Sequence, residues 1–195
     1  MTLPIDIIIH LLKKHETGQR LRLGIFYRGN RKLTEAIIEQ KHKILIMSDR
    51  FRMLHKLYSN THHTSKSSVV AIETSFDALP VAPGSLDVFM LSKNLPKTKD
   101  PVNVLRHLKV LMKPGGLLIW PHPQADTAMG NMRPRLTPSW MSKNLTAARH
   151  DICAWLMAAG YAEIEQHSQK KQGLIPWVIT TGIAHKTIPQ GDKFY

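Results

Sequence analysis

The chain has 195 residues, of which 43% are hydrophobic and 21% are charged, a balance typical of water-soluble globular proteins. Its length suffices for one core, so we expect a single domain over residues 1–195. Cys153 is the only cysteine, which excludes a disulfide within the chain and fits a reducing compartment. The formal net charge of +13 attracts RNA, ribonucleoprotein or an anionic membrane surface, or it serves solubility alone.

Residues 1–19 predict an N-terminal helix. Ile5, Ile8 and Leu12 fall on one helical stripe, and Gly18 follows as a stop signal. The segment has no basic stretch before its apolar residues and is much shorter than a membrane span. We therefore expect neither a signal peptide nor a transmembrane segment, and a cytoplasmic protein.

The next part of the chain alternates short apolar strands with amphipathic helices. The strand at 44–47 is a continuous apolar run, which is typical of strands buried in a parallel sheet. The expected elements are a strand at 21–25, a helix at 33–40, a strand at 44–47, a helix at 51–58, a polar loop at 60–68 and a strand at 69–72.

The second half repeats this alternation and ends with two strands. A Lys-Pro-Gly-Gly stretch predicts a tight turn, because proline fixes φ and glycine permits positive φ. The expected elements are a strand at 87–91, a helix at 101–112, the turn at 113–116, a strand at 117–120, a proline-rich loop or lid within 121–140, a helix at 146–159, and an antiparallel hairpin at 163–167 and 175–184. This order predicts an α/β fold: a doubly wound, Rossmann-like, mostly parallel seven-stranded sheet with a C-terminal antiparallel hairpin and helices on both faces.

Three sequence motifs resemble one enzyme superfamily. Leu79-Pro80 followed by the stretch PGSLDV at 83–88 is similar to a loop and strand of the class I S-adenosylmethionine-dependent methyltransferases. The stretch LKVLMKPGGLL at 108–118 and the later AAGY at 158–161 are also similar. The match is best to the broad group that contains the quinone-biosynthesis C-methyltransferases. The resemblance implies the sheet described above and S-adenosylmethionine as cofactor.

In such enzymes a glycine-rich turn after the first strand lets the backbone approach the cofactor, because glycine has no Cβ. The corresponding stretch keeps Gly24 and Gly29, which the resemblance implies as cofactor contacts. Phe26 and Tyr27 occupy the crowded middle of the motif, and Arg22 stands where the family usually has an acidic residue. The motif is therefore not satisfied.

The other two cofactor motifs also depart from the family pattern. A carboxylate at the end of the second strand should accept hydrogen bonds from the ribose, but Ser48 stands there and Asp49 follows one position later. After the third strand an acidic residue is expected near the adenine. Ser75 and Phe76 stand near that position and Asp77 lies beyond them, so Phe76 either packs on the adenine or belongs to the core.

Further candidates follow the fourth and fifth strands. Ser92 begins a loop at the carboxyl edge of the sheet, where ligands of open α/β sheets bind, so it is a candidate ligand contact. The alternative is that this loop is an ordinary solvated one. His122 is the best-placed general base for an acceptor hydroxyl or amine, or simply a loop histidine. The pair His62-His63 has no third ligand at a recognisable spacing, so we expect no metal site.

Basic residues crowd the region of the second strand. Lys43, Arg50, Arg52 and Lys56 form a candidate nucleic-acid-binding surface, with Arg52 and Lys56 on one helical face. A solvated face without function explains them equally well.

These observations lead to two hypotheses about function. In the first, the chain is a methyltransferase with an altered cofactor turn that acts on a small molecule or RNA beneath the lid. Alternatively, it is a catalytically inactive methyltransferase-fold module that binds RNA or a protein complex through its basic surface. Attachment to anionic lipid is a weaker third hypothesis, because no strongly amphipathic basic helix supports it.

Overall fold

The computed structural model describes residues 5–16, 18–27, 29, 31–61, 68–91, 100–123, 149–168 and 177–185. Helices and strands alternate along the chain as the apolar periodicity predicts. The elements are α1 (Ile5–His15), β1 (Arg22–Phe26), α2 (Arg31–Ile38), β2 (Lys43–Ser48), α3 (Phe51–Thr61), β3 (Ser68–Glu73), the 3-10 turn η1 (Phe76–Ala78), β4 (Leu86–Leu91), α4 (Pro101–Leu111), β5 (Met112–Pro123), α6 (Arg149–Ala158), β6 (Tyr161–Ser168) and β7 (Trp177–Ala184).

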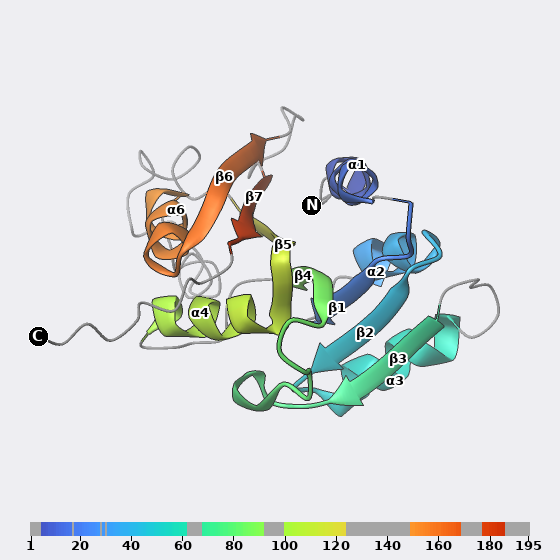
Figure 1. The fold of residues 1–195 in the computed structure, drawn as a ribbon. Helices are drawn as coiled ribbons and strands as arrows, with labels where there is room; N and C mark the ends of the chain where they lie inside the picture. Colours follow the sequence, from blue (N-terminus) through green and yellow to red (C-terminus); the bar gives the residue numbers. More distant parts are fainter. Residues whose placement is uncertain are drawn as a thin grey trace, which may run out of the picture.

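The strands form one seven-stranded sheet in the order β3-β2-β1-β4-β5-β7-β6 (Figure 1). The pairs from β3 across to β5 are parallel, whereas β7 is antiparallel to both β5 and β6. The predicted fold class, including the C-terminal antiparallel hairpin, is confirmed.

The sheet is the middle of three layers. One hydrophobic cluster joins it to α1, α2 and α3, and a second cluster joins its other face to α4 and α6. Most residues of β1, β2 and β4 are buried, which fits the continuous apolar run at 44–47 in the sequence. Among the described helices, none is long and apolar enough to cross a membrane.

The sequence prediction of strand β5 was too short at both ends. The strand begins at Met112, and the Lys-Pro-Gly-Gly stretch is an irregularity inside it rather than a separate turn. Met112 pairs with Leu86 and Leu117 pairs with Val88, so four β5 residues stand opposite the single residue between Leu86 and Val88. Gly115 supplies the positive φ (83°) that this bulge needs.

At the carboxyl end of β5, residues 121–123 pair with β7, so the predicted lid cannot begin at 121. The remainder of that segment lies outside the described residues.

The observed boundaries of several other helices and strands differ from the predicted ones by a few residues. Helix α3 continues to Thr61 and β3 begins at Ser68, so both ends of the predicted polar loop at 60–68 are regular structure. Residues 62–67 lie outside the described part of the chain. Helix α2 ends at Ile38 rather than residue 40, because Glu39 and Gln40 form the turn into β2.

Asp87 connects the amino ends of three neighbouring strands. It lies in β4, and its carboxylate accepts hydrogen bonds from the backbone N–H of Arg22 in β1 (2.8 Å) and from Lys113 Nζ in β5. Burial alone would raise the pKa of Asp87, but the hydrogen bonds and positive charges of Lys113 and Arg22 outweigh it and lower that pKa. The ring of His15, at the end of α1, also interacts with the Asp87 backbone and carboxylate.

We predict that Asp87→Asn destabilises the protein in a pH-dependent way. A carboxylate whose pKa is lowered by folding stabilises the native state above its unfolded pKa of about 3.9 and ceases to do so as the pH falls through its folded pKa. The difference in unfolding free energy between wild type and variant should therefore be full at pH 7 and shrink below about pH 4. Urea denaturation across this pH range measures it, and a pH-independent difference would contradict the role of the charge.

Candidate functional site

The strand order defines where a ligand would bind. The chain runs outward from β1 through β2 to β3, then returns to place β4 on the other side of β1. Ligands of open α/β sheets bind at the carboxyl ends of the strands at such a reversal. The ends of β1, β2 and β3 (Phe26, Ser48 and Glu73) lie at this carboxyl edge, and the turns that follow them are the places to search for a site.

The two glycines of the predicted cofactor turn have different positions. Gly24 lies inside β1, paired with Leu45 and Phe89, and a Cβ added to it would meet Leu86 Cδ1 at 2.7 Å. Its small size serves core packing, so its assignment to the turn was wrong. Gly29 does lie in the turn between β1 and α2, with a φ of 97° that disfavours any side chain.

The residues between these glycines are part of the core. Phe26 is 2% exposed and packs edge-on against Phe76, with ring centroids 4.6 Å apart. Tyr27 packs into the cluster on the opposite face of the sheet, and burial raises its pKa. The beginning of the turn is therefore fixed by two buried aromatic rings.

Ser48, the last residue of β2, makes two hydrogen bonds with the residues around it. The residue is fully buried, and its Oγ accepts a hydrogen bond from the backbone N–H of Arg50 (3.2 Å). Its backbone carbonyl accepts another from Thr74 N (2.9 Å), which joins the ends of β2 and β3. Asp49 is exposed in the bend that follows, so it is the carboxylate that this turn presents to solvent.

The candidates after β3 and β4 are only partly described. Phe76 is 5% exposed, and its contact with Phe26 makes it a core residue. Asp77 lies in η1, and its side chain is outside the described part of the structure. Ser92 is also outside the described residues, so its predicted role stays a prediction.

His122 lies in a strand rather than in the predicted loop. It is at the end of β5, is 3% exposed, and its Nε2 lies 2.8 Å from Thr180 Oγ1 on β7. Gln166 on β6 donates a hydrogen bond from Nε2 to the same hydroxyl (3.3 Å). The ring of Trp120, two residues before His122, stacks on Trp155 of α6. His122 is thus held in a buried polar cluster at the carboxyl end of β5.

Sequence reasoning missed Thr180 and Gln166. Each is an ordinary polar residue in a strand pattern, and only the pairing of β5, β7 and β6 brings them to His122. A detectable signal was the polar pair Thr180-Thr181 within an otherwise apolar strand, because buried hydroxyls require hydrogen-bonding partners.

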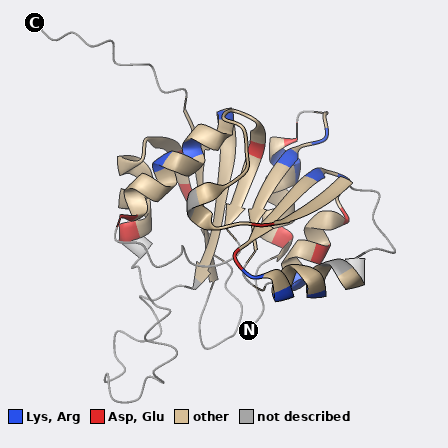
Figure 2. Ribbon diagram, turned by 90° about the horizontal axis from the view of Figure 1, so that it is seen from below, with Lys and Arg blue, Asp and Glu red and all other residues tan. Residues whose placement is uncertain are grey.

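The structure separates one predicted basic residue from the other three. Lys43 begins β2 at the amino edge of the sheet, whereas Arg50, Arg52 and Lys56 lie beyond its carboxyl end, in the bend and on α3. The cluster of four was therefore an artefact of sequence proximity. Lysine and arginine positions occur at both edges of the sheet and on several helices (Figure 2).

The three residues that stay together lie close in the sequence to an exposed aromatic residue, Phe51. Arg50, Arg52 and Lys56 are all exposed. Phe51, between the two arginines, is 60% exposed and lies with its ring centroid 6.0 Å from that of His55. We call this set, Arg50, Phe51, Arg52, His55 and Lys56, the α3 face.

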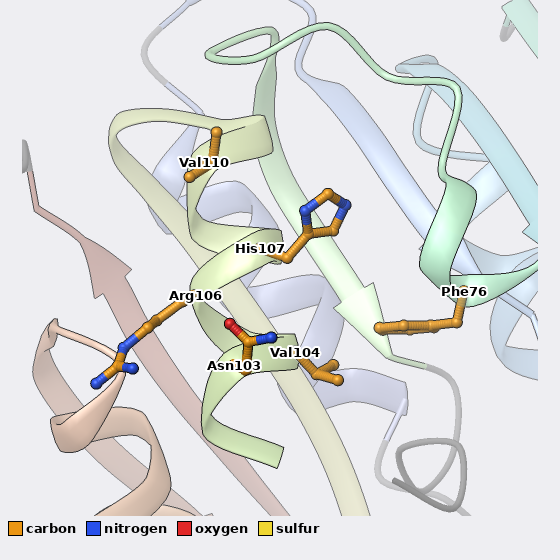
Figure 3. A pocket seen from close by; sticks show the side chains of 6 residues that line it. All are labelled: Phe76, Asn103, Val104, Arg106, His107 and Val110. Atoms are coloured by element: carbon orange, nitrogen blue, oxygen red, sulfur yellow. The ribbon is translucent and has the colours of Figure 1, made fainter. Parts of the chain in front are cut away.

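A groove of about 460 Å³ lies between α4 and η1 (Figure 3). Phe76 and Val104 form apolar parts of its lining, and His107 points into it. Arg106 points toward α6, where its Nη2 donates a hydrogen bond to the Ala158 carbonyl (3.0 Å). Within the part of the chain that the structure describes, no group of three or more His, Cys, Asp or Glu side chains is placed to hold a metal ion.

Comparison with known proteins gives the family resemblance. Residues 29–120 match the family model of a methyltransferase domain. The solved structures with a similar fold include the CurJ carbon methyltransferase, with a TM-score of 0.71 and 14% identity over 93% of this chain and 53% of that one. The resemblance to the class I methyltransferases is confirmed.

Two further structures agree with this methyltransferase fold. A putative methyltransferase of Haloferax volcanii, solved with the Trm112 methyltransferase activator, has a TM-score of 0.71 and 14% identity over 92% of this chain and 88% of its own. A methyltransferase of Aquifex aeolicus has a TM-score of 0.68 and 11% identity over 93% and 90% of the two chains. No curated protein sequence matches this chain.

Two of the described residues at this edge differ from the contacts that are usual for the cofactor in this fold. Ser48 is buried and uses its hydroxyl within the turn, where a ribose-binding carboxylate is expected. Gly24 is buried in the sheet, which leaves Gly29 in the turn beside the rings of Phe26 and Tyr27. The described residues that remain available at this edge are Gly29 in the turn and the exposed carboxylate of Asp49.

We predict that Thr180→Val costs about 1–3 kcal/mol of unfolding free energy, because His122 and Gln166 each lose a buried hydrogen bond. The matched variant is Thr181→Val, whose hydroxyl makes a weaker 3.5 Å contact with the Glu165 carbonyl. Urea denaturation of both variants measures the difference. Equal losses would show that the cluster around Thr180 has no special contribution.

Proposed function

We propose that this chain is a methyltransferase-like protein that acts as a binding module for an anionic macromolecule, RNA or an acidic protein, rather than as a conventional S-adenosylmethionine-dependent enzyme. The observation that carries the proposal is the α3 face, where exposed Phe51 lies between Arg50 and Arg52 directly after the carboxyl end of β2. Exposed cations next to an exposed aromatic residue suit contacts to phosphates and bases, or to the acidic rim of a protein.

The position of the α3 face supports this proposal. It follows the strand end at which a methyltransferase of this fold is expected to hold the ribose with a carboxylate. Here the exposed carboxylate of Asp49 is followed by the cations of Arg50 and Arg52. The exposed charged side chains from Asp49 to Lys56 are thus one carboxylate and three cations, and the formal net charge of +13 adds to the attraction of a polyanion.

Two further observations favour a partner of this kind. The Haloferax volcanii neighbour was solved with a protein activator, so an assembly of this fold with a second protein has a precedent. The single cysteine supports a cytoplasmic location, where both RNA and acidic proteins are available.

We expect the double variant Arg52→Glu, Lys56→Glu to lower the affinity for oligouridylate or polyglutamate by at least about tenfold, because it replaces two exposed cations with anions. Binding of the wild type should also weaken steeply with salt. Fluorescence anisotropy with each labelled polyanion measures both effects.

The matched control is Lys13→Glu, Lys14→Glu, which reverses two exposed lysines on α1 and changes the net charge equally. It should retain most of the affinity. Equal losses in the two double variants would show that net charge rather than the α3 face attracts the polyanion. No binding by the wild type at low salt would refute the proposal.

S-Adenosylmethionine-dependent methyl transfer is the second candidate function, favoured by the family-model match over residues 29–120. Gly29 and the exposed Asp49 are the described residues that would hold the cofactor, which supplies an electrophilic methyl group when bound. We expect calorimetry with S-adenosylmethionine to show no saturable binding. Micromolar binding that is lost in Asp49→Asn and kept in the nearby Glu73→Gln would favour the enzyme instead.

A further inference from the structure

His42 is a buried histidine at the amino edge of the sheet. It directly precedes β2 and is 2% exposed, although its chain neighbours Lys41 and Lys43 are exposed. The backbone N–H of Lys43 donates to the Leu21 carbonyl (2.9 Å), which holds the start of β2 beside the start of β1. Among the described residues, Nδ1 of His42 is buried and has no hydrogen-bond partner. A neutral imidazole carries a hydrogen on only one of its nitrogens, so it fits this position.

Protonation of His42 in this position is unfavourable for two reasons. The imidazolium carries a hydrogen on both nitrogens, so Nδ1 would become a buried donor without an acceptor. The positive charge would also lose its hydration. Burial accordingly lowers the pKa of His42, although the Glu16 carboxylate acts in the opposite direction. The folded protein therefore keeps this ring neutral at a pH at which the unfolded chain would protonate it.

The end of α1 meets the amino edge through two histidine–carboxylate interactions. Glu16, directly after α1, interacts with His42. His15, the last residue of α1, is partly buried and interacts with Asp87 of β4. Burial lowers the pKa of His15 more than Asp87 raises it. Among the described residues, the charged groups that act on these rings are Glu16 for His42 and Asp87 for His15, and Asp87 also interacts with Lys113 and Arg22.

α1 can move without breaking the sheet, because it is not one of the paired strands (Figure 1). It packs Ile8, Leu11 and Leu12 on the cluster that also includes α2 and α3. Elements that are held by side-chain packing at the end of a chain open more readily than central strands. The two histidines lie where this helix ends and the sheet begins.

From these observations we propose that the contact between the end of α1 and the amino edge is a pH-sensitive switch, in which protonation of His42 and His15 releases α1 from the sheet. In the released state both rings reach water, where an imidazolium is stable. A histidine whose pKa is lowered by folding destabilises the folded arrangement as the pH falls below its unfolded value of about 6.5. The switch lies at the edge opposite the α3 face, so it does not depend on the proposed function.

Hydrogen exchange of the full-length protein tests the proposal. Protection of the amides in the last turn of α1, corrected for the intrinsic pH dependence of exchange, should fall at least about tenfold between about pH 7.5 and pH 5, because the released state takes up protons that the docked state excludes. At each pH these amides should also be less protected than those of β4, since α1 opens without the sheet. Equal protection of α1 and β4, or α1 protection that does not change with pH, would overturn the proposal.

The variants remove the titrating rings. His42→Leu cannot take up a proton, so protection of α1 should depend less on pH than in the wild type, and the double variant His15→Leu, His42→Leu should lose this dependence between about pH 7.5 and pH 5. His10→Leu replaces an exposed histidine of the same helix and is the matched control, which should keep the wild-type dependence. A double variant that responds to pH as the wild type does would show that these rings are not the switch.

A titration of the wild type keeps the test independent of how well the variants fold. The ring carbon signals of His42, followed by nuclear magnetic resonance, should show protonation below about pH 6.5, together with the loss of α1 protection. Protonation of His42 at or above that pH while α1 stays protected would mean that the buried ring accepts a charge in place, and the proposal would then be wrong.

Discussion

The carboxylate of Asp87 is a constraint on which much of this structure depends. It lies in the central strand β4 and bonds to the backbone of Arg22 in β1 and to Lys113 in β5. A carboxylate held between two neighbouring strands fixes how far each can slide, and a slip of one residue would turn every buried side chain to the wrong face. The bulge in β5 faces this same position, with Gly116 packed against the Asp87 carbonyl.

The bonds of Asp87 lie at the amino edge of the sheet, whereas ligands of open α/β sheets bind at the carboxyl edge. At the carboxyl edge the core closes itself, through Phe26 against Phe76 and through the buried hydroxyl of Ser48. These residues satisfy packing and hydrogen bonding without a ligand. The interactions that maintain the fold at this edge are thus separate from contacts to a cofactor.

The outer part of the sheet has the surface on which the proposed function depends. Helix α3 and strand β3 are neighbours in the sequence and in space, so one short region combines exposed cations, the aromatic ring of Phe51 and the exposed side chain of Val70. Charge attracts a partner over a distance, whereas backbone hydrogen bonds and apolar contacts act only at close range.

The sequence by itself determined the order of strands and helices, the buried parallel strands and the final hairpin, because continuous apolar runs and helical stripes are local patterns. It also placed Gly29 in the turn after β1. Only the tertiary structure decided that Gly24 is a packing residue, since that depends on Leu86 and Phe89 from a distant strand.

The tertiary structure also decided the positions of Lys43 and His122, for which the sequence predictions were wrong. Lys43 and Arg50 are close in the sequence, but an extended strand carries them to opposite edges of the sheet. His122 meets Thr180 and Gln166 only through the pairing of three strands. A local pattern specifies the type of an element, whereas the neighbours of a side chain follow from the strand order, and that order is fixed by contacts between residues far apart in the chain.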